Sequence, residues 1–236
     1  MKKNIFVIAM LMFFQSLAMA QMPVANEKSN AITYYANEFA DIINRVQLEK
    51  DTAYMVSTVK VADACVTMMN KNQILGKVGE TIFKELTKNS SKYPNLLDGG
   101  KVKKSCRKYE EMNDNQRALV WVLVMTTMAH FESSCSDKAK AKGPNGMAYG
   151  YFQLHKGKEN LYVKGKGSCV KNASGNAALA SKCALGMLEK QMERSSGVLF
   201  DNKSYWEVLR PIGPAQKSQH IAKALAKSSL CNPAVM

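Results

Sequence analysis

Histidine, tryptophan and proline are scarce in this chain of 236 residues, which has three, two and six of them. No two of its six cysteines have the close spacing of zinc ligands, and only His130, His155 and His220 could complete such a site. The sequence therefore predicts neither a metal nor a cofactor. It also has no internal repeat and no low-complexity tract, which disfavours repeat architectures.

Acidic residues are also few: 19 Asp and Glu stand against 33 Lys and Arg, so the net charge is +14. Such a positive field attracts polyanions, whether nucleic acid, anionic lipid or the acidic polymers of a cell envelope. Lysines cluster within 101–104, 138–142 and 164–166, although each cluster can equally be a solvated face. Binding of single-stranded nucleic acid requires aromatic residues that are interleaved with such basic clusters. In this chain they are mostly not interleaved, so the pattern disfavours nucleic acid.

Residues 1–20 have the features of a secretory signal peptide: two early lysines, an apolar stretch over 5–14, and small residues shortly before Gln21. The apolar stretch is shorter than the ~20 residues of a membrane-spanning helix, which favours a cleaved signal over a membrane anchor. Because Gln21 and not a cysteine follows the cut, we expect no lipoprotein anchor. The chain is expected to be secreted or periplasmic.

An even number of cysteines in an exported chain favours disulfides. The sequence does not choose among the possible pairings of Cys65, Cys106, Cys135, Cys169, Cys183 and Cys231.

Apolar residues recur at steps of three and four along most of the chain, which predicts amphipathic helices. The expected helices cover residues 32–46, 55–69, 78–86, 116–131, 177–193 and 216–230. Between them, residues 89–100 are rich in Asn, Ser, Pro and Gly and predict a loop, the best internal boundary in the chain.

The helix over 116–131 follows two candidate cap residues, Asn113 and Asp114. Residues 118–125 are apolar on all sides, as expected of a helix that is buried all round. A turn is then predicted at 143–146, and residues 149–154 are the best candidate for a strand. The sequence thus predicts a mainly α protein with a short β-hairpin.

Glu132 stands where this apolar helix ends. A glycosidic oxygen leaves readily only when protonated, so an enzyme that cuts sugar chains needs an acid that keeps its proton near neutral pH. Apolar surroundings give a carboxyl group this property, because they disfavour its charged form. A surface glutamate near a helix end is the other interpretation of Glu132, and the residues after it decide against that. A disulfide at Cys135, three positions on, could fix the loop that positions the acid.

Glu132-Ser133 and the later segment Ala148-Tyr149-Gly150-Tyr151-Phe152-Gln153 resemble the first two motifs of the lysozyme-like superfamily, which includes soluble lytic transglycosylases and goose-type lysozymes. Members carry Glu-Ser at the end of a core helix, then a turn and the pattern Ala-x-Gly-aliphatic-x-Gln. Tyr151 departs from the aliphatic residue. Downstream the match is weaker, since Lys182 stands where the family has asparagine.

The resemblance implies an α+β lysozyme-like catalytic domain over residues 113–236, with residues 21–112 as an accessory or packed helical region. It implies an exported enzyme that cuts the β-1,4 bond between N-acetylmuramic acid and N-acetylglucosamine, with peptidoglycan glycan strands as partner and a monomeric state. Glu132 is expected to be the general acid. Other expected site residues are Tyr205, which would orient the acid, and the substrate-binding residues Ser133, Tyr149, Gly150, Tyr151 and Gln153. Ordinary strand packing is the alternative for the tyrosines at 149 and 151, and core packing for Tyr205.

Hydrolysis needs a group that positions or deprotonates water. The candidate carboxylates Asp137, Glu159, Asp201 and Glu207 can each equally be surface charges. Family members with a lone glutamate often cut without water, when the 6-hydroxyl of the sugar closes a 1,6-anhydro ring, so both outcomes stay open. The rival function is a non-catalytic, basic protein of this fold that binds cell wall or polyanions.

Overall fold

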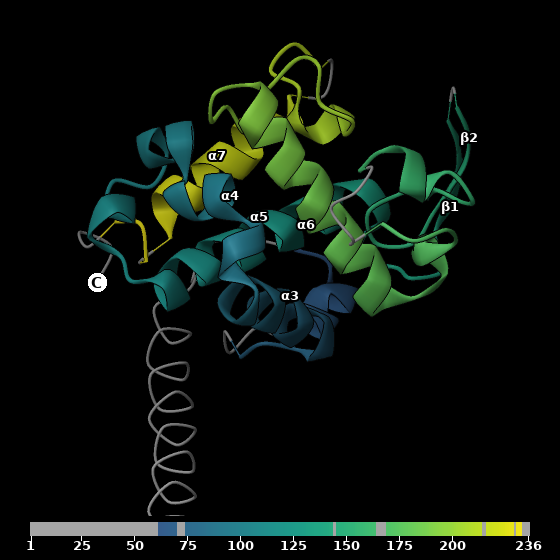
Figure 1. Ribbon diagram of the computed structural model, residues 1–236, viewed down its shortest axis with the longest axis horizontal. Coiled ribbons are helices and arrows are strands. Elements are labelled where there is room, and N and C mark those ends of the chain that lie inside the picture. Colours follow the sequence, from purple (N-terminus) through teal and green to yellow (C-terminus); the bar gives the residue numbers. More distant parts are fainter. Residues whose placement is uncertain are drawn as a thin grey trace, which may run out of the picture. The chain divides into compact units, whose positions relative to one another are not determined.

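The computed structural model describes residues 61–69, 74–143, 145–163, 169–213, 216–228 and 230–232. The chain divides into two units, residues 1–47 and 48–236, and all the described residues belong to the second. The expected signal peptide and the helix over 32–46 lie outside the described residues. The described part is mainly helical and has a small antiparallel sheet (Figure 1), which confirms the expected mainly α class with a short hairpin.

Four of the expected helices are confirmed, with ends that differ by a few residues from the prediction. The helices of the described part are α3 (Lys77–Lys88), α4 (Pro94–Asp98), α5 (Asp114–Ser133), α6 (Ala177–Arg194) and α7 (Lys217–Lys227). Short 3-10 helices join them; three matter for the site, namely η1 (Asp63–Thr67), η5 (Glu159–Leu161) and η7 (Glu207–Leu209).

Helix α5 forms the centre of the core. It begins with a capping box in which the Asn113 side chain accepts from the Gln116 N–H and the Gln116 side chain accepts from the Asn113 N–H. Every residue from Ala118 to Ala129 is buried, and helices α3, α4 and α7 all pack against α5. The all-round apolar pattern of this segment is thus explained by neighbours on several sides.

Two predictions about helices and loops were wrong over the described residues. The described end of the expected helix over 55–69 is the 3-10 helix η1, after which Met69 pairs with Leu75 in an isolated β-bridge. The expected loop over 89–100 contains a 3-10 turn and α4. Pro94 suits the first turn of α4 because its fixed φ matches a helix, and Gly99 ends it in a left-handed conformation, φ 80°.

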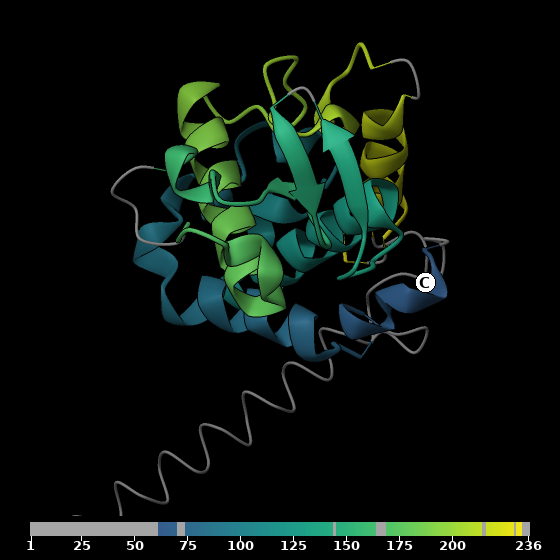
Figure 2. The ribbon, with the colours of Figure 1, turned by 90° about the vertical axis from the view of Figure 1, so that its right-hand side faces the viewer.

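The sheet has three short strands in the order β1 (Lys140–Gly143), β2 (Gly146–Tyr149) and β3 (Leu154–His155). It lies beside the helices and faces the viewer in Figure 2. Gly143 pairs with Gly146, so the turn predicted there is confirmed. The strand predicted over 149–154 was wrong in its middle: Gly150 (φ 70°) and Gln153 (φ 45°) adopt left-handed conformations, which break a pleated strand.

All six cysteines form disulfides: Cys65–Cys135, Cys106–Cys231 and Cys169–Cys183. Three disulfides are typical of proteins that fold in an oxidising compartment. Among the helices of the described residues, none combines the length and the apolar character that crossing a membrane requires.

A buried carboxylate holds α4 in place. Glu189 of α6 is 1% exposed and accepts hydrogen bonds from the Asn95 N–H (3.1 Å), the Asn95 side-chain amide (2.6 Å) and the Leu96 N–H (2.9 Å). These are the otherwise unpaired donors at the start of α4, and a negative charge there is favourable.

We expect Glu189→Gln to destabilise the folded protein by roughly 2–3 kcal/mol, because a neutral amide accepts more weakly and turns a donor toward these N–H groups. Denaturant unfolding with the disulfides intact measures this change. Glu80→Gln on α3, where the carboxylate is half exposed, is the matched control and should change stability by no more than ~0.5 kcal/mol. Equal effects of the two substitutions would contradict this role of Glu189.

Candidate active site

Glu132 is the penultimate residue of α5, and the chain turns sharply just after it. Ser134 and Cys135 both have left-handed backbone conformations, with φ values of 52° and 58°. Non-glycine residues rarely adopt two such conformations in succession, so the surrounding contacts must hold this turn.

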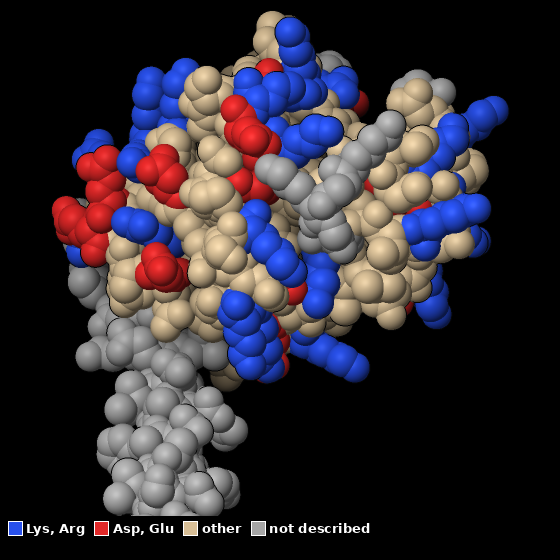
Figure 3. All heavy atoms as spheres, in the orientation of Figure 1, with Lys and Arg blue, Asp and Glu red and all other residues tan. Residues whose placement is uncertain are grey.

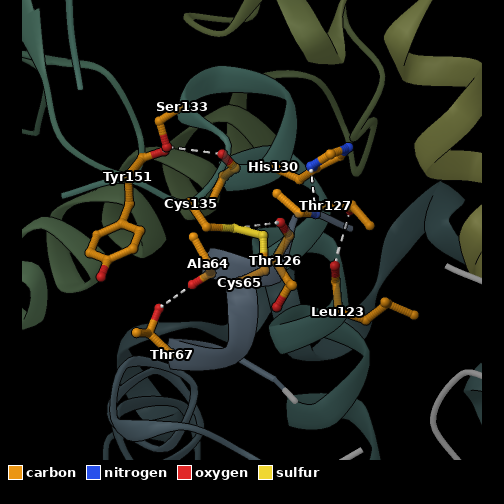
Figure 4. The surroundings of a disulfide bond; sticks show 12 residues. Ala64, Cys65, Thr67, Leu123, Thr126, Thr127, His130, Ser133, Cys135 and Tyr151 are labelled. Carbon is orange, nitrogen blue, oxygen red and sulfur yellow. Dashed lines mark hydrogen bonds between the residues drawn. A yellow bond between two sulfur atoms is a disulfide. The ribbon is translucent and has the colours of Figure 1, made fainter. Parts of the chain in front are cut away.

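The Cys65–Cys135 disulfide supplies one of these contacts. It joins η1 to the turn that follows Glu132, and both half-cystines are buried (Figure 4). Next to it, His130 of α5 accepts a hydrogen bond at Nδ1 from the Ala62 N–H, at 3.0 Å. The histidine therefore links α5 to the segment just before η1.

Ser133 fastens the other side of the turn. Its hydroxyl lies 3.0 Å from both the Ala129 carbonyl and the Tyr151 carbonyl, so it links the end of α5 to the turn between β2 and β3. The Tyr151 ring points away from Ser133 (Figure 4) and is 6% exposed. Ser133 thus brings the two sequence motifs, residues 132–133 and 148–153, into direct contact.

The Glu132 carboxyl is largely buried, and burial together with the nearby negative charge of Glu207 raises its pKa from 4.5 to about 7. A hydrogen bond from the Val208 backbone and the positive charge of Arg210 act in the opposite direction but are outweighed. Glu132 therefore retains a proton close to neutral pH, which is the property required of a general acid.

Tyr205 lies close enough to Glu132 for the charge of the ionised carboxylate to affect the pKa of the phenol. Its hydroxyl is 2.9 Å from the Gln153 carbonyl and 3.0 Å from His155 Nδ1. Burial, then the neighbouring Tyr162 and the negative charge of Glu132, raise the Tyr205 pKa, so the phenol stays protonated.

Sequence reasoning missed two members of the site. His155 and Tyr162 pack with Tyr205 into a cluster of three rings, with centroids 4.8 to 6.0 Å apart, and the Tyr162 hydroxyl hydrogen-bonds His155 Nδ1. Burial and then the charge of Lys158 lower the His155 pKa, so the imidazole is neutral at pH 7. No local signal marks these residues, because Tyr205 follows His155 by 50 positions.

The remaining residues of the second motif occupy different surroundings. Gln153 is 8% exposed; its amide nitrogen donates to the Gly150 carbonyl at 2.8 Å, while its Oε1 has no hydrogen-bond partner. A Cβ atom at Gly150 would lie 3.1 Å from the Ser174 carbonyl, so this glycine permits close backbone packing. Tyr149 is set apart on β2, where the ammonium groups of Lys140 and Lys156 lie 5.6 and 5.3 Å from its ring centre.

The four carboxylates proposed from sequence as partners of Glu132 differ in their roles. Glu159 is fully buried and accepts from Ser174 and Asn172; although burial alone raises the Glu159 pKa, these hydrogen bonds outweigh it and hold the pKa below 4.5. Asp201 is paired with Arg194 at 2.7 Å. Asp137 is exposed. Glu207 is also exposed, and its negative charge raises the pKa of Glu132.

Within the described residues no group of three or more His, Cys, Asp and Glu side chains is arranged to hold a metal ion.

Lys182, at the position of the family asparagine, pairs with the buried Glu85 of α3 at 3.1 Å and so links α6 to α3.

Three solved structures of the Bdellovibrio protein Bd0314 DslA share this fold, one of the wild type and two of glutamate-to-glutamine mutants. The sequences are 21 to 22% identical, the TM-scores are 0.53 to 0.54, and the matches cover 66% of this chain and 91% of that protein. No family model and no curated protein match this chain. At this level of identity the likeness shows the fold alone.

Glu132→Gln tests the buried acid through stability. Below pH 4.5 the carboxyl is neutral in both the folded and the unfolded chain, whereas above pH 7 it is ionised in both and burial penalises the charge only in the folded state. The wild type thus loses stability relative to the variant as the pH rises from 4.5 through 7. We expect Glu132→Gln to be more stable by roughly 2–3 kcal/mol at pH 8 and equal to wild type near pH 4.

Guanidinium unfolding at the two pH values measures this difference. Glu110→Gln is the matched control, because the Glu110 side chain is 72% exposed and should show no pH-dependent gain. The same small effect from both substitutions would mean that the Glu132 carboxyl is not held neutral.

Proposed function

We propose that this protein is an exported peptidoglycan-cleaving enzyme in which Glu132 is the general acid. The observation that carries this proposal is the carboxyl of Glu132 itself, held at the end of a buried helix with a pKa raised by burial to about 7. The bond to be cut is the β-1,4 linkage between N-acetylmuramic acid and N-acetylglucosamine. This substrate comes from the resemblance of the two motifs to the lysozyme-like superfamily.

Several contacts support the assignment. Ser133 links the acid to the turn of the second motif, and Tyr205 lies beside Glu132 with its hydroxyl on the Gln153 carbonyl. A glycosidase site needs such an arrangement, because acid catalysis depends on a proton donor whose position is fixed relative to the sugar. The three-ring cluster of His155, Tyr162 and Tyr205 would form a rigid wall beside this donor.

The hairpin that follows the acid supports binding to an acidic polymer. Residues 138–158 contain five lysines and neither Asp nor Glu. Lys138, Lys140 and Lys142 are exposed, and blue side chains gather in Figure 3 over the end of the molecule where Figure 1 labels β1 and β2. Residues 138–158 are called the lysine arm below. The positive charge of this arm would attract the carboxylates of the wall polymer.

The first experiment is release of soluble muropeptides from purified peptidoglycan. We expect wild-type protein to release them and Glu132→Gln to lower the rate at least ~100-fold, because the amide has no proton to give. Glu110→Gln should keep the wild-type rate. Activity should fall as the pH rises through about 7, where Glu132 loses its proton.

The rival function, binding without cleavage, predicts a different result. A wild-type protein that sediments with peptidoglycan but releases nothing under any of these conditions would show a binding protein, and the enzymatic proposal would fall. Mass spectrometry of released products separates the two enzymatic outcomes, because hydrolysis leaves reducing ends and transglycosylation leaves anhydro ends lighter by one water.

A second experiment tests the lysine arm in the inactive Glu132→Gln background. Replacing Lys138, Lys140 and Lys142 together by glutamine should weaken peptidoglycan binding roughly three- to tenfold at low salt, and the difference should disappear near 0.5 M salt. The matched control replaces three exposed lysines elsewhere, Lys101, Lys104 and Lys223. If both triple variants bind alike, the effect reflects net charge and the arm has no particular part in binding.

A further inference from the structure

We propose that Glu207 is the second carboxylate of this site and the general base that deprotonates the attacking water, an inference that rests on the proposed function. With Glu207 as the general base for an attacking water, the reaction is a hydrolysis. Of the four carboxylates that the sequence offered, Glu159 and Asp201 have their oxygens engaged in structural contacts, and Asp137 is an exposed residue beyond the turn.

The segment that carries Glu207 is fixed from both sides. The residue before it, Trp206, is buried and donates its indole N–H to the Phe152 carbonyl at 2.8 Å, and Tyr205 donates to the Gln153 carbonyl. The backbone of Val208, the residue after it, lies close enough to the Glu132 carboxyl to lower its pKa. Glu207 is therefore held between the second motif and the end of α5, against which η7 packs.

Arg210 completes this anchoring. Its guanidinium Nε donates to the Ser204 carbonyl at 2.9 Å, and Nη2 lies 3.4 Å from the Tyr205 carbonyl. The charged and titratable groups that face Glu132 are thus Glu207 and Arg210 from the η7 segment, together with the phenol of Tyr205. These hydrogen bonds fix the backbone on both sides of Glu207.

The two carboxyls have opposite environments, as an acid and a base require. Glu132 is largely buried and retains its proton, whereas Glu207 is exposed to water. The negative charge of Glu207 also helps Glu132 to remain protonated, since two adjacent carboxylates disfavour double ionisation. Glycosidases that use two carboxyl groups divide their tasks in this way.

The proposed step balances as follows. The bond between the anomeric carbon and the bridging oxygen breaks, its electron pair stays on that oxygen, and the oxygen takes the proton of Glu132. A water oxygen forms the new bond to the anomeric carbon, and its proton passes to Glu207. The products are one free hydroxyl and one reducing end, after which Glu207 releases its proton to solvent and Glu132 regains one.

Glu207→Gln tests this role. We expect muropeptide release to fall roughly 10²–10³-fold with unchanged thermal unfolding, because the amide accepts no proton from water. Azide needs no deprotonation before it attacks, so adding it should partly restore cleavage and form a glycosyl azide that mass spectrometry detects. A merely structural role of Glu207 would give neither rescue nor azide product.

A second measurement is independent of turnover. The Glu132 pKa, followed by carbon NMR of its carboxyl group, should fall in Glu207→Gln because a neighbouring negative charge is gone. Asp137→Asn is the matched control, and both its cleavage rate and its Glu132 pKa should match wild type.

The outcomes separate the two proposals. If Glu132→Gln is inactive while Glu207→Gln cleaves at the wild-type rate, or if wild-type products carry anhydro ends, the role of Glu207 is overturned and the proposed function stands. If wild-type protein releases nothing, both fall. A Glu132 pKa that is unchanged in Glu207→Gln would also overturn the proposed pairing of the two carboxyls.

Discussion

The burial of one carboxyl group at the end of α5 is the constraint on which the site depends. An ionised glutamate in an apolar environment is unfavourable, so Glu132 retains its proton to about pH 7. This requires that the helix leading to it be surrounded by α3, α4 and α7, and that the chain after it turn away at once. The core and the site are therefore products of the same packing.

Three distant segments meet at this carboxyl. The Cys65–Cys135 disulfide fixes the turn after Glu132 from one side, and Ser133 joins it to the Tyr151 carbonyl on the other. The η7 segment brings Val208 to the Glu132 carboxyl itself. Each segment alone is a short turn with little stability of its own, so the position of the acid depends on all of them.

Periodic patterns allowed much of the fold to be predicted, because a long amphipathic or fully apolar helix has a repeated signal. Helices α5 and α6 were predicted to within a few residues from such patterns and, for α5, from cap residues such as Asn113. Short elements had no comparable signal. The segment around Gly150 is composed like a strand yet turns, since its backbone conformation is set by contacts with distant residues such as Ser174.

The sequence alone determined the mainly helical class, the even set of cysteines and the positive charge, because composition and local periodicity carry these. The resemblance of two motifs to the lysozyme-like superfamily is what marked Glu132 as the residue to consider. Tertiary structure alone decided the disulfide pairing, the contact of Tyr205 with His155 and Tyr162, and which carboxylate faces Glu132. These features depend on contacts between residues that are tens of positions apart in the sequence. Only packing in three dimensions decides that, since burial and electrostatic coupling act between neighbours in space.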